Sequence, residues 1–595
     1  MQIKLSRNRG PVASALLLFG MSVLLAACDS GEVASIPPVE PTDIAVVPKA
    51  RGLLPRLNES DLAFDSVHYT GRENCTSCHN SENMQITTDA GALDLSIGTA
   101  FETSAMANSS RDPYWHAVVS AELHRYPELT EEINTTCTVC HAPMAVDMAR
   151  KEGKHVQPFD TGSVENGDFK QGFYSMDKDD EIFNHAMDGV SCSFCHQIAD
   201  VSLGDESSFT GGYTVLPVIP GTNERVAYGQ YPDPDGAYMI QQSGTTPVFA
   251  SHLGTSETCA TCHNLFSHSL DKDGVAVPDA PPFPEQTIFT EWQQSDYSIG
   301  KPKEATCQAC HMPIVDEPVE ISSLGGQKRD NFAQHTFLAA NTVLQDMLSN
   351  FAQELGVPEN LDFNSAIERN RIFLESAATI SINDPVNNDG TLAFNINVQN
   401  HTGHKLPSGY HSRRVYLHVL VVNEAGEVVF ESGKINDDGS ITGVDEDRDP
   451  SLWEPHYGLI DHPGQVQVYQ SIMSNSDGER AHSLLNSLDY FKDNRLLPVG
   501  LQKSQASPEI AVKGNAVRDF DFDAGGDTID YEVSISDTGS YTVLAELRYQ
   551  PMSFGHLQDL FLLSEEIDTV DMFRTIYENT TLRDEIIDST TIVVE

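Results

Sequence analysis

Five copies of one short motif, Cys-x-x-Cys-His, are the residues of this chain most clearly arranged for chemistry. They are Cys75–Cys78–His79, Cys137–Cys140–His141, Cys192–Cys195–His196, Cys259–Cys262–His263 and Cys307–Cys310–His311. In this motif the two thiols form thioether bonds to the edge of a porphyrin, and the adjacent imidazole binds the iron from one face. The sequence therefore predicts five covalently bound haem c groups, each with a proximal histidine ligand.

The cysteine count leaves little room for other thiol chemistry. The chain has 11 Cys, and the five motifs use all but one of them. Structural zinc sites usually combine two Cys-x-x-Cys units, which does not suit an odd number of units that each end in His. A thioredoxin-like redox motif would be single and would lie in a βαβ unit. Zinc binding and thiol redox chemistry are therefore both disfavoured.

Each iron also needs a ligand on its distal face, or an open position there. The chain has 21 His, most of them outside the motifs, and residues directly after a proximal His lie on the wrong side of the porphyrin. Ligation by two histidines would keep a potential low, whereas a Met ligand would raise it. The candidate distal ligands, chosen by position, are His185, His335, His404, His252 and His116.

The N-terminus has the pattern of an export signal. Basic residues precede an apolar stretch over 12–27, and the stretch ends in Leu24-Leu25-Ala26-Ala27-Cys28. This pattern predicts a lipoprotein signal peptide over 1–27, lipidation of Cys28 and a Pro-rich tether over 28–60. The alternative is an ordinary cleavage site with Cys28 incidental. We expect an exported protein, in the periplasm or at the cell surface, anchored by lipid to the inner or outer membrane.

The charge of the chain is strongly negative. Lys and Arg number 36 against 87 Asp and Glu, for a formal net charge of −51. Such a surface repels nucleic acid, so no nucleic-acid partner is expected. It suits solubility in a salty habitat, and it also suits docking to positively charged redox partner proteins.

The length of 595 residues predicts two or three domains. Residues 61–340 hold every motif and predict a mostly helical and irregular multihaem domain. A helical connector is expected over 341–378, where apolar residues recur at helical spacing. From 379 to 595, short alternating β-branched runs separated by Gly and Asn/Asp turns predict a β-sandwich-like domain. The expected fold class is α+β and multidomain.

A second cofactor is suggested by an acid-rich loop in the last of these regions. It contains Asp437, Asp438, Asp445, Asp447 and Asp449, whose carboxylates are ligands of the kind that Ca²⁺ prefers. The spacing is not that of an EF-hand, and a plain turn explains the same residues. Calcium is thus the weaker of the two cofactor predictions.

Several phrases of the sequence resemble the large multihaem c-type cytochromes of bacterial respiratory chains. They include RDPYWHAVVSAE (111–122), DGVSCSFCHQI (188–198), ETCATCHNL (257–265), EWQQSDY (291–297), CQACHMP (307–313), NHTGHKLPSG (400–409) and KDNRLLPVG (492–500). The resemblance implies electron transfer through closely packed haem groups. It also implies that the Thr-Gly-His-Lys loop can bring a remote histidine, here His404, to an iron. It does not identify a substrate.

Three functions fit these features. The first is an electron conduit between respiratory partners. The second is a reductase or oxidase that acts on a small nitrogen or sulfur compound at one five-coordinate haem, although the Cys-x-x-Cys-Lys motif of many pentahaem nitrite reductases does not occur. The third is a docking role for the β domain. We favour electron transfer over catalysis, because the protein then needs only to ligate, bury and space the haem groups.

Overall fold

The computed structural model describes residues 54, 57–80, 84–88, 91–153, 181–219, 222, 224–388, 390–536 and 539–595. The predicted signal peptide, Cys28 and most of the tether over 28–60 lie outside the described residues. In the part of the chain that is described, no helix combines the length and the apolar character needed to cross a bilayer.

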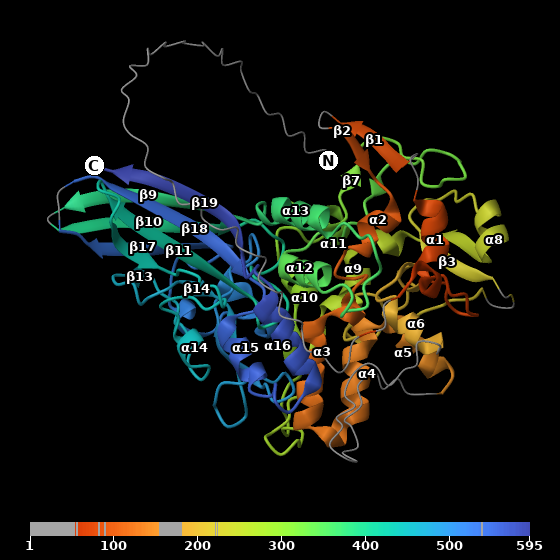
Figure 1. Ribbon diagram of the computed structural model, residues 1–595, viewed down its shortest axis with the longest axis horizontal. Helices are drawn as coiled ribbons and strands as arrows, with labels where there is room; N and C mark the ends of the chain where they lie inside the picture. Colours follow the sequence, from red (N-terminus) through yellow and green to blue (C-terminus); the bar gives the residue numbers. More distant parts are fainter. Residues whose placement is uncertain are drawn as a thin grey trace, which may run out of the picture. The chain divides into compact units, whose positions relative to one another are not determined.

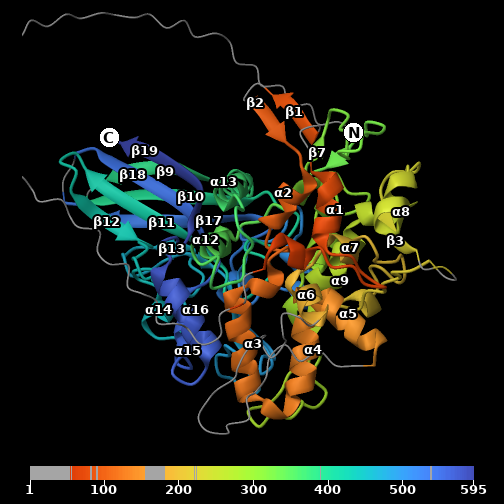
Figure 2. The same cartoon turned by 45° about the vertical axis from the view of Figure 1, so that its right-hand side comes forward.

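The first part of the described chain is built from short helices and two-stranded sheets. The helices are α1 (Arg72–His79), α2 (Ile97–Glu102), α3 (Pro113–Arg125), α4 (Thr130–His141), α5 (Pro143–Lys151), α6 (Glu181–Met187), α7 (Cys192–Cys195), α8 (Ala237–Ser243), α9 (Ser256–His263), α10 (Ile288–Gln293) and α11 (Cys307–His311). The longest of them, α3 and α4, lie side by side in both views (Figure 1, Figure 2). Asp112 caps α3 by accepting from the backbone N–H groups of Tyr114 and Trp115.

Four pairs of short strands connect these helices. They are β1 (Gln85–Thr88) with β2 (Gly91–Asp94), β3 (Arg225–Gly229) with β4 (Thr245–Phe249), β5 (Leu265–Ser267) with β6 (Phe283–Gln286), and β7 (Ile314–Val315) with β8 (Phe332–Ala333). The β3–β4 pair is parallel and the other three are antiparallel. None of these pairs is large enough to form a core alone, because an isolated pair of strands is only marginally stable in water.

The last part is a β-sandwich of two sheets (Figure 1). One sheet has the order β13-β17-β10-β9, from Leu459–Ile460, Gly526–Ser534, Thr391–Asn400 and Ala378–Asn388. The other has the order β12-β11-β18-β19, from Val428–Ser432, Arg414–Asn423, Tyr541–Gln550 and Glu585–Val594, and β14 (Val468–Tyr469) pairs with β11. A separate short pair joins β15 (Ser471–Ser474) to β16 (Asp489–Asp493).

Alternation along the strands explains why these sheets stack. In β10, Leu392, Phe394, Ile396 and Val398 are buried, and the residues between them are only partly covered. Side chains of a strand alternate between its two faces, so this pattern gives the sheet one apolar face. The equivalent face of β18 packs into the same core. Burying each such side chain contributes about 1.5–3 kcal/mol. The predicted α+β fold class is confirmed.

Five further helices accompany the sandwich: α12 (Thr342–Asn350), α13 (Phe363–Leu374), α14 (Asp445–Arg448), α15 (Phe554–Phe561) and α16 (Asp568–Asn579). The first two fall within the segment 341–378, where helix was expected. Helices α15 and α16, between β18 and β19, were not predicted. Their apolar residues, such as Leu557 and Phe573, share a core with Ala117 and Ala121 of α3. The domain boundaries expected from the sequence stay a prediction.

The acid-rich loop over 437–449 contributes an ion pair to the sandwich. Arg414, at the start of β11, is fully buried, and its guanidinium lies 2.7 Å from a carboxylate oxygen of Glu446 and 2.7 Å from one of Asp447. Asp447 also accepts from the backbone N–H of Ile441 at 2.6 Å. The carboxylate of Asp447 is thus occupied by protein donors, which gives the calcium expected at this loop no support.

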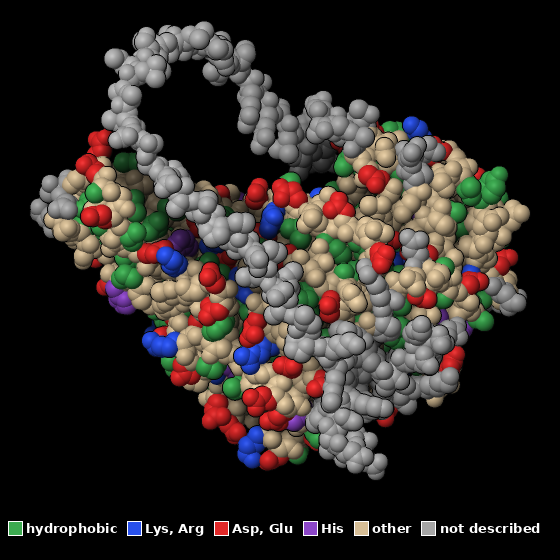
Figure 3. Space-filling view, in the orientation of Figure 1, with side chains coloured by type: hydrophobic (Ala, Val, Ile, Leu, Met, Phe, Trp, Pro, Cys, Tyr) green, Lys and Arg blue, Asp and Glu red, His purple; other side chains and the backbone are tan. Residues whose placement is uncertain are grey.

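Acidic side chains are spread over the face of the molecule drawn in Figure 3. In the space-filling view, Asp and Glu outnumber Lys and Arg on the visible face, and they do not gather over one element (Figure 3). This distribution agrees with the formal charge of −51. A spread of like charge favours solubility and electrostatic steering of a cationic partner rather than one defined docking patch on this face.

Replacing Arg414 tests the buried ion pair. We expect Arg414→Met to destabilise the protein by about 3–5 kcal/mol, because the buried carboxylate of Asp447 then loses its counter-charge and Glu446 keeps only Arg480. The measurement is the midpoint of thermal unfolding. Arg448→Met is the control, since Arg448 and its partner Asp445 are exposed and that pair should contribute little. Equal melting temperatures for the two variants would contradict the role given to Arg414.

Candidate haem-binding site

A cavity of about 2280 Å³ runs through the region of the motifs. All ten motif cysteines and all five motif histidines line it. Pockets for a single small ligand are usually about 300–1,000 Å³. The volume and the lining therefore suit several large groups rather than one substrate.

The motif helices explain how two thiols and an imidazole reach the same cavity. Helices α1, α4, α9 and α11 each end at the histidine of a motif, and α7 ends at Cys195, one residue before His196. On a helix, residues three and four positions apart share a face. The two cysteines and the histidine of each motif therefore point to one side.

The backbone fixes the orientation of four motif imidazoles. In each case Nδ1 donates to a backbone carbonyl oxygen. The pairs are His79 with Ile321 (2.7 Å), His141 with Ser109 (3.0 Å), His196 with Tyr228 (2.5 Å) and His311 with Leu338 (2.6 Å). A carbonyl only accepts, so Nδ1 carries the proton and Nε2 is the nitrogen available to a metal. Metal-binding histidines commonly donate their second N–H in this way.

Two of these imidazoles face a second histidine ring. His335 lies opposite His196, with ring centres 6.3 Å apart and planes 17° from parallel. His404 lies opposite His311, also at 6.3 Å and at 24°. Imidazole–metal bonds are about 2.0 Å long and roughly 1.2 Å separates each nitrogen from its ring centre, so one metal holds two ring centres about 6.4 Å apart. Both pairs have the spacing for one iron between them.

The same backbone device orients the two facing rings. Nδ1 of His335 donates to the carbonyl of Ala333 at 3.0 Å, and Nδ1 of His404 donates to that of Lys405 at 2.9 Å. With Nδ1 protonated, Nε2 is the nitrogen of each ring that can bind a metal. Together with the thiol pairs and the cavity, these donor sets fit haem c.

The other three candidate distal ligands are placed differently. In each of them Nε2 has a protein partner. His185 Nε2 lies 3.2 Å from Ser66 Oγ, His252 Nε2 lies 2.8 Å from the carbonyl oxygen of Ile198, and His116 Nε2 lies 2.8 Å from that of Ser110. All three rings are buried, and they are not among the residues that line the cavity. The structure thus sets the rings of His335 and His404 parallel to motif imidazoles, and it gives none of these three rings such a pairing.

One contact at the site was missed by the sequence analysis. The indole of Trp115 stacks on the imidazole of His141, with ring centres 4.4 Å apart and planes within 1° of parallel. Trp115 lies on α3 and lines the cavity. It stands in the phrase 111–122, but nothing in the sequence showed that α3 and the second motif are adjacent.

Burial keeps three imidazoles of the site neutral. It lowers the pKa of His141 and of His263 to about 4, and that of His335 to about 3. The positive charge of neighbouring groups adds to this, such as Arg413 beside His263. The neutral imidazole is the form that binds a metal, so these side chains are ready to ligate at neutral pH.

Contacts between thiols show which motifs are neighbours. Contact with the Cys75 thiol raises the pKa of Cys192, contact with Cys307 raises that of Cys259, and contact with Cys262 raises that of Cys140. Burial raises the pKa of Cys195 to about 12, and the nearby Cys262 adds to it. The first motif therefore adjoins the third, and the fourth adjoins the second and the fifth and lies near the third.

A buried charge network holds the loop that carries His404. The backbone N–H of Lys405 donates to Glu291 on α10 at 3.0 Å, and Lys405 Nζ lies 2.6 Å from Asp493. Arg495 also pairs with Asp493, at 2.7 Å. Burial alone would raise the pKa of Asp493, but Arg495 and Lys405 outweigh it and hold that pKa well below its usual range. The loop from the sandwich is thereby fixed against the helical region.

Comparison with known proteins gives limited help. No protein-family model matches the chain, and no curated protein matches it. Among solved structures, it is similar to a penta-heme cytochrome c552 from Thermochromatium tepidum, with a TM-score of 0.49 and 14% sequence identity. The match covers 89% of this chain and 100% of that chain.

The pairing of His335 with His196 can be tested by substitution. We expect His335→Met to raise the reduction potential of one haem, because a Met ligand raises the potential relative to His. The measurement is a spectroelectrochemical redox titration of the purified protein. His418→Met is the control, since His418 bonds to Glu546 and Glu431 in the sandwich. Five unchanged potentials in the His335 variant would remove the assignment.

Proposed function

We propose that this chain is an exported pentahaem cytochrome c that transfers electrons between respiratory partner proteins. The observation that carries the proposal is the single cavity, lined by five complete attachment motifs, in which two motif histidines face a second histidine at the spacing of a shared metal. Haem c, when bound, supplies reversible one-electron chemistry.

The chain's own residues have distinct tasks in this proposal. The ten motif cysteines attach the porphyrins, and the motif histidines bind iron on the proximal side. His335 and His404 are the distal ligands opposite His196 and His311. Ligation by two histidines keeps these two irons at low potential and closes them to other ligands. The backbone carbonyls that accept from Nδ1 hold each ring in its binding orientation.

The neighbouring thiols define a route for electrons. The first motif adjoins the third through Cys75 and Cys192, and the fifth adjoins the fourth through Cys307 and Cys259. Cys262 of the fourth motif also contacts Cys140 of the second. The fourth motif is thus the junction of the set, and the second motif is a branch from it.

The proposed location rests on the N-terminal sequence. A signal peptide over 1–27 and a lipid on Cys28 would deliver the protein to the periplasm or the cell surface and tether it to a membrane. Attachment of haem c also takes place outside the cytoplasm, so the motifs and the signal agree. The charge of −51 favours a redox partner with a positive docking surface.

A second candidate function is reduction or oxidation of a small nitrogen or sulfur compound at an open iron. Among the described histidine rings, none faces His263 as His335 faces His196. Arg413 lines the same cavity, and its charge lowers the pKa of His263 beyond the effect of burial. A guanidinium near an open iron would suit an anionic substrate.

Removing the junction haem tests the conduit. We expect the variant Cys259→Ser/Cys262→Ser to retain four haem groups and to show slow phases when a fast reductant is mixed with it, because the second and the fifth motif both lose their neighbour. The measurement is stopped-flow reduction followed in the haem bands. The control is Cys137→Ser/Cys140→Ser, which removes the branch and leaves the other four contiguous. A single fast phase in both variants would contradict the proposed route.

Added ligands separate the two candidate functions. The conduit predicts that nitrite and hydroxylamine leave the visible spectrum unchanged. The reductase predicts a spectral shift, and Arg413→Gln should weaken that binding about tenfold or more, because a charged hydrogen-bond donor is lost. Arg448→Gln, at an exposed site far along the chain, is the matched control. A shift that Arg413→Gln does not alter would exclude Arg413 from substrate binding.

A further inference from the structure

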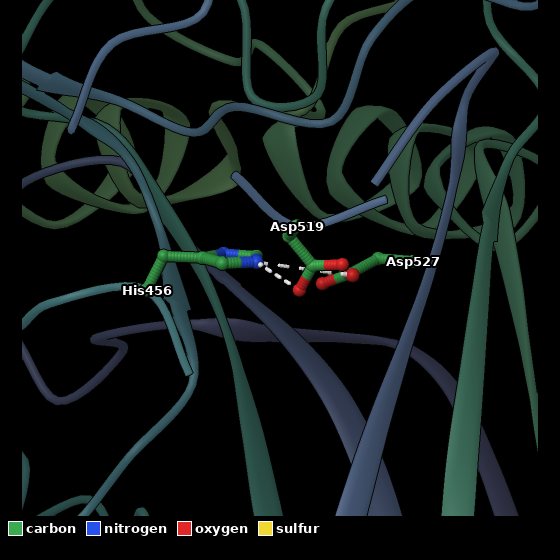
Figure 4. A group of neighbouring side chains, drawn as sticks. All are labelled: His456, Asp519 and Asp527. Atoms are coloured by element: carbon green, nitrogen blue, oxygen red, sulfur yellow. Dashed lines mark hydrogen bonds and ion pairs between the residues drawn. The ribbon is translucent and has the colours of Figure 1, made fainter. Parts of the chain in front are cut away.

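Acidic residues alternate in the segment before β17, at Asp519, Asp521 and Asp523, and Asp527 follows as the second residue of β17. Figure 4 shows the side chains of Asp519 and Asp527 pointing toward the imidazole of His456. His456 Nε2 lies 3.1 Å from Asp519 Oδ2 and 3.9 Å from Asp527 Oδ1. These three atoms all lie within 4.8 Å of one another, which no other group of His, Cys, Asp and Glu in the described residues achieves.

The hydrogen bonds around His456 fix which nitrogen carries its proton. Nδ1 accepts from the side-chain amides of Gln467 at 2.9 Å and Asn494 at 3.0 Å. The orientation of both amides is set, because their oxygens accept from the backbone N–H groups of Tyr457 and Gln470. Nδ1 is therefore unprotonated, and Nε2 carries the proton and donates it to Asp519. His456 positions Asp519 and offers no lone pair to a metal.

The carboxylates lack a matching positive charge. Asp527 is only 1% exposed, and its Oδ2 accepts from Tyr469 and Gln467, but its Oδ1 is buried without a hydrogen-bond partner. Lys503 Nζ, which lies at this loop, donates to the backbone carbonyl of Asp519 rather than to a carboxylate. A buried, unpartnered carboxylate oxygen that points at a second carboxylate is costly unless a cation joins them.

The pKa values of the carboxyl groups show the same crowding of negative charge. Burial raises the pKa of Asp527 to about 7, and the charges of Asp519 and Asp521 contribute. Burial also raises the pKa of Asp521, and contact with the carboxylate of Asp519 raises it further. Three acidic groups are thus held close enough to repel one another.

We propose that Asp519 and Asp527 bind one Ca²⁺ ion, with Asp521 adding negative charge beside them and His456 holding Asp519 in place. The donors are all oxygen atoms, which Ca²⁺ prefers, whereas Zn²⁺ prefers imidazole nitrogen and thiolate sulfur. Water completes the coordination shell. This site is separate from the haem cavity and from the acid-rich loop over 437–449.

The position of the site gives it a structural role in the loop of His404. The backbone carbonyl of Gly525, between Asp521 and Asp527, accepts from Asn400 at 2.8 Å. The side-chain amide of Asn400 in turn donates to the carbonyl of His404 at 3.0 Å. A cation that fixes the segment 519–527 therefore also braces the loop that brings His404 to His311.

Calcium depletion and return test the proposal on the full-length, haem-loaded protein. After treatment with EGTA, isothermal titration calorimetry with CaCl₂ should show one specific site, and Ca²⁺ should raise the melting temperature. Asp527→Asn should remove this site and the thermal shift. The control is Asp530→Asn, which makes the same change of charge at an exposed position of β17 and should keep both.

If the cluster holds no ion, the melting temperatures of the same two variants should behave differently. Asp527→Asn would then leave the melting temperature unchanged or raise it, because it removes a buried and repelled charge, and added Ca²⁺ would act equally on both variants. That result overturns the proposal. So does specific binding of ZnCl₂ that His456→Gln abolishes, since it would make His456 a ligand.

Discussion

A protein interior has to be filled, and here the side chains alone do not fill it. Globular interiors pack as densely as organic crystals. This chain instead surrounds about 2280 Å³ with thiols, imidazoles and apolar side chains. The helices around that space are short, and the strand pairs have two strands each. In our proposal, five porphyrins attached at ten thiols would supply this part of the core, so that attaching the cofactors and folding this region would be one process.

The loop after β10 connects the β-sandwich to the haem-binding region. The core of the sandwich is ordinary, with alternating strands that bury one face of each sheet. Yet the loop after β10 places His404 opposite His311, far away in the sequence. The network of Glu291, Lys405 and Asp493 holds this loop by buried, charged hydrogen bonds. A buried polar network is rigid when each of its groups has a hydrogen-bond partner. Such rigidity is needed here, because His404 comes from a part of the chain distant from His311.

The sequence predicted the parts of this structure that depend on local pattern. The motif spacing predicted the attachment residues, which stay a prediction. Strand β9 starts at Ala378, near residue 379, where the apolar spacing changes from helical to alternating. What it did not predict depends on contacts between distant residues. The pairing of His335 with His196, the stacking of Trp115 on His141 and the packing of α16 on α3 are examples. His185 shows the converse, because its place before the third motif suggested a ligand, whereas the structure buries its ring against Phe64.

The number of haem groups on each chain tests the central claim most directly. The protein should be produced in a host that attaches haem c. Its intact mass is then measured by mass spectrometry, and its haem content per chain by the pyridine haemochrome assay. The account predicts five covalently attached groups per chain. A colourless product, or a folded protein whose mass lacks them, would contradict it, because the cavity would then be filled by something else.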